Sequence, residues 1–134
     1  MVRVLIADDV PHTRAALRDL LQITNRIRVC GEAASAAEAV TLAVGLKPDV
    51  VVLDLRMPGG NGIEAASRIS AILPGMPIAL ISVYAGLTVD GAASDIGVSK
   101  FFSKDELGNL CSWVEGVGVP SLPRCDLASV RATD

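Results

Sequence analysis

Short runs of apolar residues recur along the chain and set its predicted architecture. Three of them lack polar alternation, namely Val2–Ala7, Val50–Leu53 and Ile78–Ile81. Strands that are buried on both faces have this pattern, as in a parallel sheet covered by helices. A weaker run, Ile27–Cys30, and the very short Phe101-Phe102 bring the number of candidate strands to five.

Helix-like segments separate these runs. Pro11 suits the first turn of a helix, and an apolar face follows it at Ala16, Leu17, Leu20 and Leu21. Further helices are predicted over Ala36–Gly45, over Ile63–Leu73, and from Leu107 to Val114. The segment Gly86–Gly97 is the weakest helix of the set, because two glycines interrupt it.

Strand and helix therefore alternate five times, which predicts an α/β fold with a doubly wound, five-stranded parallel sheet and right-handed crossovers. We expect the flavodoxin-like strand order 2-1-3-4-5. From Gly116 onward, glycines and prolines punctuate the chain. We therefore expect one domain over residues 1–117 and a tail or linker over 118–134, too short for a second domain.

Composition and charge narrow the function classes. The chain of 134 residues is 51% apolar and carries a net charge of −3, without a run of Lys or Arg. Disorder, direct nucleic-acid binding and attachment to an anionic membrane are therefore not expected. The apolar runs are also too short for a signal peptide or a membrane span.

The three cysteines indicate neither a disulfide framework nor a zinc site, because none of them forms a C-x-x-C pair. We expect Cys30 and Cys111 to be buried as small apolar groups, and Cys125 to lie in the tail. This usage fits a cytoplasmic protein in a reducing cytosol.

Two predicted strands end in carboxylates. The first strand ends in Asp8-Asp9, and the third ends in Asp54. In the order 2-1-3-4-5 these two strands flank the point where the winding reverses, which is where open α/β sheets bind ligands. Three converging carboxylates repel one another, and a hard divalent cation such as Mg²⁺, which prefers oxygen ligands, would relieve that repulsion.

Two more polar residues complete a candidate site. Ser82 closes the fourth strand and Lys104 follows the fifth. A nucleophilic carboxylate, a metal, a hydroxyl and a cation together define a phosphoryl-transfer site. Each residue alone has a plainer interpretation as a helix cap, a turn residue or a solvated charge. The arrival of all five at the carboxyl ends of four strands favours a shared site.

At these residues the sequence resembles the receiver family of two-component response regulators. The matching pieces are Val4–Asp9, Asp54–Gly59, Gly62, Ser82 and Lys104, and the resemblance runs from about residue 2 to residue 116. It implies that Asp54 is the phosphoacceptor, and that a histidine kinase or a phosphotransfer protein supplies the phosphoryl group. Such a domain is not an enzyme, although it assists its own phosphotransfer and dephosphorylation.

The resemblance also implies the roles of the other site residues. Asp9, Asp54 and the backbone carbonyl of Arg56 would bind Mg²⁺ directly, and Asp8 would act mainly through water. Ser82 and Lys104 would contact the phosphoryl group.

Phe101, three residues before Lys104, stands where the family has an aromatic residue that turns inward on activation. An ordinary core ring is the alternative for this residue.

Three further pieces resemble receivers of the NarL/FixJ type: Gly31-Glu32-Ala33, Ser82-Val83-Tyr84 and Lys104-Asp105. Such receivers usually precede a helix-turn-helix DNA-binding domain, which is not found in these 134 residues. A stand-alone receiver and a fragment of a longer regulator both remain open. Helix-mediated homodimers are common in the family, and the sequence identifies neither an interface nor an output partner.

Three other interpretations compete with this one. A flavodoxin-like cofactor binder needs a glycine-rich phosphate loop, whereas the segment after the first strand is acidic and lacks glycine. An aspartate-nucleophile phosphatase needs an Asp-x-Asp arrangement and a cap domain. A pseudo-receiver, which binds a protein partner without phosphorylation, stays open because the Gly86–Gly97 segment matches the family poorly.

Overall fold

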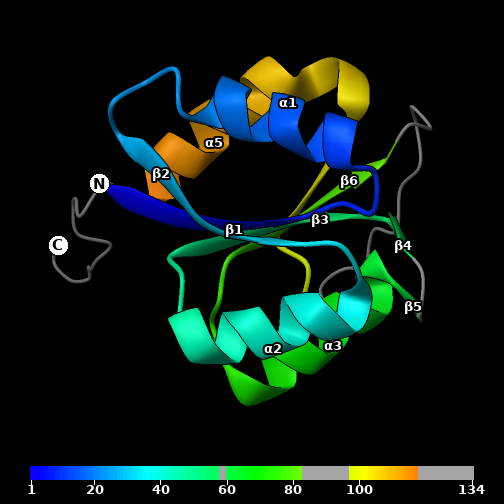
Figure 1. Ribbon diagram of the computed structural model, residues 1–134. Coiled ribbons are helices and arrows are strands. Elements are labelled where there is room, and N and C mark those ends of the chain that lie inside the picture. Colours follow the sequence, from blue (N-terminus) through cyan, green and yellow to red (C-terminus); the bar gives the residue numbers. More distant parts are fainter. Residues whose placement is uncertain (58–59, 83–96, 118–134) are drawn as a thin grey trace, which may run out of the picture.

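A five-stranded parallel sheet lies between two pairs of helices, α1 with α5 and α2 with α3 (Figure 1). The computed structural model describes residues 1–57, 60–82 and 97–117. The strands are β1 (Val2–Ala7), β2 (Ile27–Ala33), β3 (Val50–Asp54), β4 (Arg56–Met57), β5 (Gly60–Asn61), β6 (Ile78–Ser82) and β7 (Lys100–Ser103). The helices are α1 (Pro11–Leu21), α2 (Ala36–Leu46), α3 (Gly62–Ile72), the 3₁₀ turn η1 (Lys104–Glu106) and α5 (Leu107–Val117).

The strand order of the main sheet is β2-β1-β3-β6-β7, and every neighbouring pair is parallel. Without the small antiparallel hairpin of β4 and β5, this is the predicted order 2-1-3-4-5. The α/β fold class and the sheet topology are therefore confirmed. Because all five strands run the same way, their carboxyl ends meet at one edge of the sheet.

The predicted elements are found close to their predicted bounds. Asp54 and Ser82 end β3 and β6 as predicted. The main differences are that β2 runs on to Ala33 and that β7 extends one residue beyond Phe101-Phe102 at each end. The hairpin of β4 and β5 was not predicted. The expected helix over Gly86–Gly97 and the expected tail over 118–134 lie outside the described residues, apart from Gly97.

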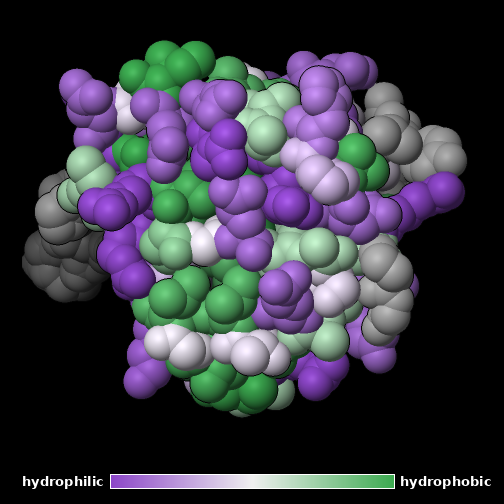
Figure 2. Space-filling model, in the orientation of Figure 1, coloured by the Kyte–Doolittle hydropathy of each residue, from purple (hydrophilic) through white to green (hydrophobic). Residues whose placement is uncertain are grey.

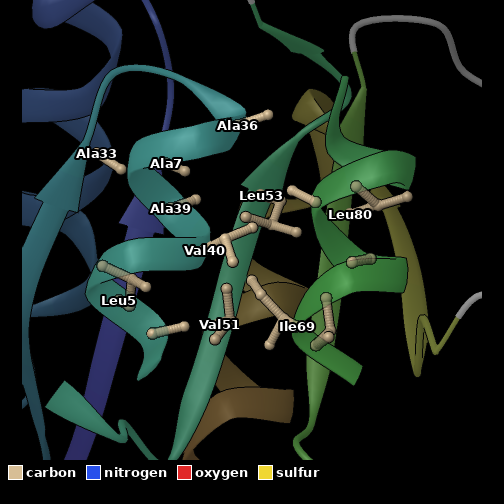
Figure 3. Close-up of a cluster of buried hydrophobic side chains, with 14 of the residues drawn as sticks. Leu5, Ala7, Ala33, Ala36, Ala39, Val40, Val51, Leu53, Ile69 and Leu80 are labelled. Carbon is tan, nitrogen blue, oxygen red and sulfur yellow. The ribbon is translucent and has the colours of Figure 1, made fainter. Parts of the chain in front are cut away.

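Side chains on β3 alternate between the two layers of the core, as the pleat of a strand requires. Val50 and Val52 pack with α1 and α5, whereas Val51 and Leu53 pack with α2 and α3. All four are 0% exposed, which confirms that this strand is buried on both faces. Figure 3 shows Val51 and Leu53 among the residues that fill the α2–α3 side. By the same alternation, Asp54 continues the row that faces α1 and α5.

The start of α3 lies against the end of β3. Asn61 caps this helix by accepting the backbone N–H of Glu64 at 2.8 Å. At Gly62 a β-carbon would lie 2.5 Å from the backbone oxygen of Asp54 and 2.6 Å from the Leu80 side chain. The absence of a side chain at Gly62 therefore lets the helix approach the strand that carries Asp54.

Polar side chains cover much of the face in Figure 2, and apolar ones gather over the lower layer of α2 and α3. Val44 and Ile72, on these two helices, are exposed large hydrophobic residues. None of the helices in the described ranges is long and apolar enough to cross a membrane.

The prediction that two cysteines are buried is wrong. Cys30 and Cys111 are free and half-buried. Cys30 lies on the edge strand β2, where the pairing with β1 is irregular and skips from Val29 to Gly31. Partial burial still raises the pKa of both thiols. Cys125 lies outside the described residues.

Candidate functional site

Three carboxylates converge at the carboxyl edge of the sheet. Asp8 directly follows β1, Asp9 comes next, and Asp54 ends β3, which is the sheet neighbour of β1. One carboxylate oxygen from each lies within 4.8 Å of the others. Asp8 is buried, Asp54 is half-buried and Asp9 is exposed. The structure thus brings together the acidic cluster (Asp8, Asp9 and Asp54) that the strand ends predicted.

Lys104 lies beside two members of this cluster. Its Nζ is 3.4 Å from Oδ2 of Asp54 and 3.5 Å from Oδ2 of Asp8. A capping box holds the turn η1: the Ser103 hydroxyl accepts the N–H of Asp105, and Glu106 accepts the N–H of Ser103 at 2.9 Å. Lys104 is therefore a partner of both acids, and the plainer interpretation as a solvated charge does not hold.

Burial dominates the electrostatics of Asp54. Partial burial raises the pKa of its carboxyl, because the charged form loses solvation. The Lys104 ammonium opposes this rise in the pKa, and the charge of Asp8 adds to it. Oδ1 also accepts the backbone N–H of Arg56, over a long 3.4 Å. The Lys104 ammonium therefore does not fully offset the effect of burial on Asp54.

Backbone and side-chain contacts hold Asp8 on several sides. Its N–H donates to the Ala33 carbonyl at 3.0 Å, and its Oδ1 accepts the N–H of Val10 at 2.9 Å. Its own carbonyl accepts Nη1 of Arg14 at 2.7 Å. The side chain does not cap α1, whose N-cap is Val10 without a side-chain bond, so the interpretation of Asp8 or Asp9 as a helix cap is not supported.

The other predicted site residues lie at the same edge. Ser82 is buried at the end of β6, one residue past Ile81, the sheet partner of Asp54. Arg56 is the exposed residue of strand β4 and lies two residues beyond Asp54. Phe101 is half-buried and packs against the α2–α3 side of the core. Both interpretations of Phe101, switch and core ring, are compatible with this position.

A cavity of about 300 Å³ opens beside the acidic cluster, between α1 and α5. Asp8, Asp54 and Lys104 line one part of it, and side chains such as Leu17 and Leu107 supply an apolar wall. The cavity leaves room next to Asp54, and its apolar wall contributes to the desolvation of that carboxylate.

The chemistry of the donor set fits a hard divalent cation. All the candidate ligands are oxygens, and the Lys104 ammonium contacts two of the three carboxylates, Asp8 and Asp54. Burial first, and the charge of Asp8 second, raise the pKa of Asp54 and so disfavour its ionised form. A divalent cation would relieve both effects.

Comparison with known proteins identifies the family. The response regulator receiver domain model matches residues 4–115. The chain therefore belongs to the response regulator receiver family, as its strand-end residues and its sheet order indicated.

Individual relatives agree with this assignment. The DNA-binding transcriptional activator DevR/DosR of Mycobacterium tuberculosis is 38% identical over 122 residues, which cover 88% of this chain and 55% of that protein. A LuxR-family two-component response regulator from Aurantimonas aligns with a TM-score of 0.81 at 30% identity, over 87% of this chain and 84% of the other. This agrees with the resemblance to receivers of the NarL/FixJ type.

A third comparison is with the response regulator TrrA of Thermotoga maritima in complex with Mg²⁺ and BeF. It aligns with a TM-score of 0.74 at 27% identity, over 85% of this chain and 99% of TrrA. In contrast to this full-length match, the chain spans about half the length of the first curated regulators that it resembles, 48% and 55%.

The sequence analysis missed two features of the site. Arg14, on α1, was not singled out, although its side chain donates a hydrogen bond to the backbone carbonyl of Asp8, next to Asp9. Gly62 was noted only as part of the resemblance, and its close approach to Asp54 depends on packing that the sequence does not display.

Proposed function

We propose that this domain accepts a phosphoryl group on Asp54 and signals through the change in shape that follows. The observation that carries the proposal is the placement of the Asp54 carboxylate. It lies within reach of two further carboxylates and 3.4 Å from the Lys104 ammonium. This arrangement provides a nucleophile, a cation site and a counter-charge in one place.

The phosphoryl donor in this proposal is the phosphohistidine of a histidine kinase or a phosphotransfer protein. An oxygen of Asp54 forms a bond to phosphorus while the bond from phosphorus to the histidine nitrogen breaks. The imidazole leaves with that electron pair and takes up a proton from solvent. The chain acts here as a phosphoacceptor rather than as an enzyme that turns over a separate substrate.

Asp8, Asp9, Asp54 and the backbone carbonyl of Arg56 would hold Mg²⁺, with Asp8 acting mainly through water. When bound, the metal ion supplies positive charge that screens the approaching phosphoryl group. The complex of the related TrrA with Mg²⁺ and BeF supports this choice of ion.

The residues of this chain then respond to the new charge. Lys104 pairs with a phosphoryl oxygen instead of with Asp54 alone, and the Ser82 hydroxyl donates to another. These contacts bias the domain between two conformations, and Phe101 turns inward in one of them. The output partner binds the surface that this change produces. A second copy of the chain, which would form a homodimer, is one such partner.

Intact-mass measurement after incubation with Mg²⁺ and phosphoramidate tests this proposal. The wild-type protein is expected to gain one phosphoryl mass. The Asp54→Ala variant and EDTA-treated wild-type protein are expected to keep their original mass. Asp19→Ala, which removes an exposed carboxylate on α1, is the matched control and is expected to gain the phosphoryl mass as the wild type does.

Beryllofluoride, a stable mimic of the phosphoryl group, covers the case of a short-lived adduct. A folded protein that gains no mass and binds no beryllofluoride would refute the proposal. That result would instead favour the pseudo-receiver, a module that binds a protein partner without phosphorylation.

A further inference from the structure

We propose that Arg14 is a positioning residue for the divalent cation site, although it touches neither the cation nor the phosphoryl group. It would act through the peptide between Asp8 and Asp9, and Glu32 would hold it in place. This inference deepens the function proposed above and rests on the acidic cluster being a cation site.

Arg14 links α1 to the segment that follows β1 and to strand β2 at the edge of the sheet. From α1, its Nη1 donates to the backbone carbonyl of Asp8 at 2.7 Å. Its Nε donates to Oε1 of Glu32 on β2 at 3.1 Å. The side chain is only 18% exposed, so solvent competes weakly for these contacts. The rigid guanidinium fork thus fixes the Asp8 carbonyl relative to β2.

The carbonyl of Asp8 belongs to the peptide plane that leads into Asp9. A rotation about the Cα–C bond of Asp8 would turn this plane and move the Cα and the side chain of Asp9, the exposed member of the acidic cluster. Asp8 itself is held by the Ala33 carbonyl and by the N–H of Val10. Arg14 is therefore placed to determine how well the oxygens of Asp9 converge with those of Asp8.

Glu32 also binds a second arginine of α1, which provides an internal control. Nη1 of Arg18 lies 3.1 Å from Oε2 of Glu32, and Nε of Arg18 lies 3.3 Å from Asp19. If this network only tied α1 to β2, Arg14 and Arg18 would be equivalent. In the part of the chain that the structure describes, the Arg14 side chain donates to the backbone of Asp8, whereas the Arg18 side chain donates to the carboxylates of Glu32 and Asp19.

Charge and geometry predict opposite effects of removing Arg14. Loss of a positive charge near an acidic cluster would strengthen cation binding, because less repulsion opposes the ion. Loss of the bond to the Asp8 carbonyl would weaken binding, because the ligand oxygens are no longer held in position. The sign of the change in affinity for the cation therefore distinguishes a purely electrostatic effect of Arg14 from a positioning role.

Isothermal titration calorimetry of the full chain with Mg²⁺, in the absence of a phosphoryl donor, provides the test. For Arg14→Gln we expect the Kd for Mg²⁺ to rise about tenfold, as for the loss of an outer-shell contact. Arg14→Lys keeps the charge but cannot donate in two fixed directions, so its Kd is also expected to rise by about fivefold or more. Arg18→Gln is the matched control, and we expect its Kd to stay within about twofold of the wild type.

Thermal unfolding of each variant without metal identifies those that are folded. If Arg14→Gln fails to fold, Arg14→Lys carries the same test.

An unchanged or tighter Kd in a folded Arg14 variant would overturn the positioning role alone, because the wild type would still bind Mg²⁺. Equal weakening in Arg18→Gln would also overturn it and would assign the network to holding α1 on β2. A wild type that binds no Mg²⁺ would overturn both this inference and the proposed function.

Discussion

Substitution of Gly62 by alanine is a sharp test of how closely α3 and β3 must approach. The added β-carbon would lie 2.5 Å from the Asp54 carbonyl oxygen and 2.6 Å from Cδ2 of Leu80. Contacts under 3.0 Å are essentially never seen for a real β-carbon, so the backbone of β3 or α3 must shift by about 0.5 Å. Leu80 is 0% exposed and has little free space into which it can move.

The magnitude follows from the cost of overpacking a dense core. Such changes destabilise by about 1–3 kcal/mol, and we expect Gly62→Ala to cost about 2 kcal/mol. The thermal midpoint of a domain of this size then falls by about 8 °C. Because the carbonyl that must move belongs to the nucleophile, phosphorylation of Asp54 is expected to slow about tenfold as well.

Differential scanning calorimetry and the rate of mass gain from phosphoramidate are the assays. Gly45→Ala is the matched control, because a β-carbon on this helical glycine of α2 would meet nothing within 4 Å. It is expected to raise stability by about 0.5 kcal/mol through helix propensity and to leave the phosphorylation rate unchanged. A Gly62→Ala protein that is as stable and as fast as Gly45→Ala would refute the reasoning.

Two further substitutions test the electrostatics and the local structure of the site. In metal-free buffer at neutral pH, we expect Asp54→Asn to raise the thermal midpoint. Because the pKa of Asp54 is raised in the folded protein, its ionised form lowers the free energy of unfolding above that pKa. The gain in thermal midpoint of Asp54→Asn should vanish as the pH falls below 3.8, the ordinary pKa of an aspartate, because the wild-type carboxyl is then protonated in both states. An equal gain in thermal midpoint at all pH values would contradict this explanation. Ser103→Ala removes the acceptor for the Asp105 N–H and should cost about 1 kcal/mol in urea titration, with weaker beryllofluoride binding because Lys104 lies within that turn. Ser112→Ala, on the exposed face of α5, is its control, and equal effects of the two would argue against a role for the cap.

The sequence predicted those parts of the fold that depend on local pattern. Runs such as Val50–Leu53 are apolar at every position because both faces of the strand are covered, and the sheet order follows from the alternation of strands and helices. Asp8 and Asp54 were predicted because a parallel sheet brings the ends of its strands together.

Other features could not be predicted, because they depend on distances between segments far apart in the chain. Arg14 and Glu32 are separated by 18 positions, and nothing in the pattern of α1 distinguishes Arg14 from Arg18. The half-burial of Cys30 depends on an irregularity in the pairing of an edge strand. Apolar character alone does not say whether a strand residue is skipped by its neighbour.

Because side chains alternate along β3, the direction in which Asp54 points depends on whether it stands an odd or an even number of residues after the core residues of the strand. Asp54 faces α1 and α5 because it stands an even number of residues after Val50 and Val52, which pack on that side. An apolar exchange within the strand leaves this count intact, whereas the insertion or deletion of one residue would point the carboxylate toward α2 and α3. Sequence change in this strand is therefore constrained more tightly in length than in identity, and an indel of two residues would keep the facing that an indel of one would reverse.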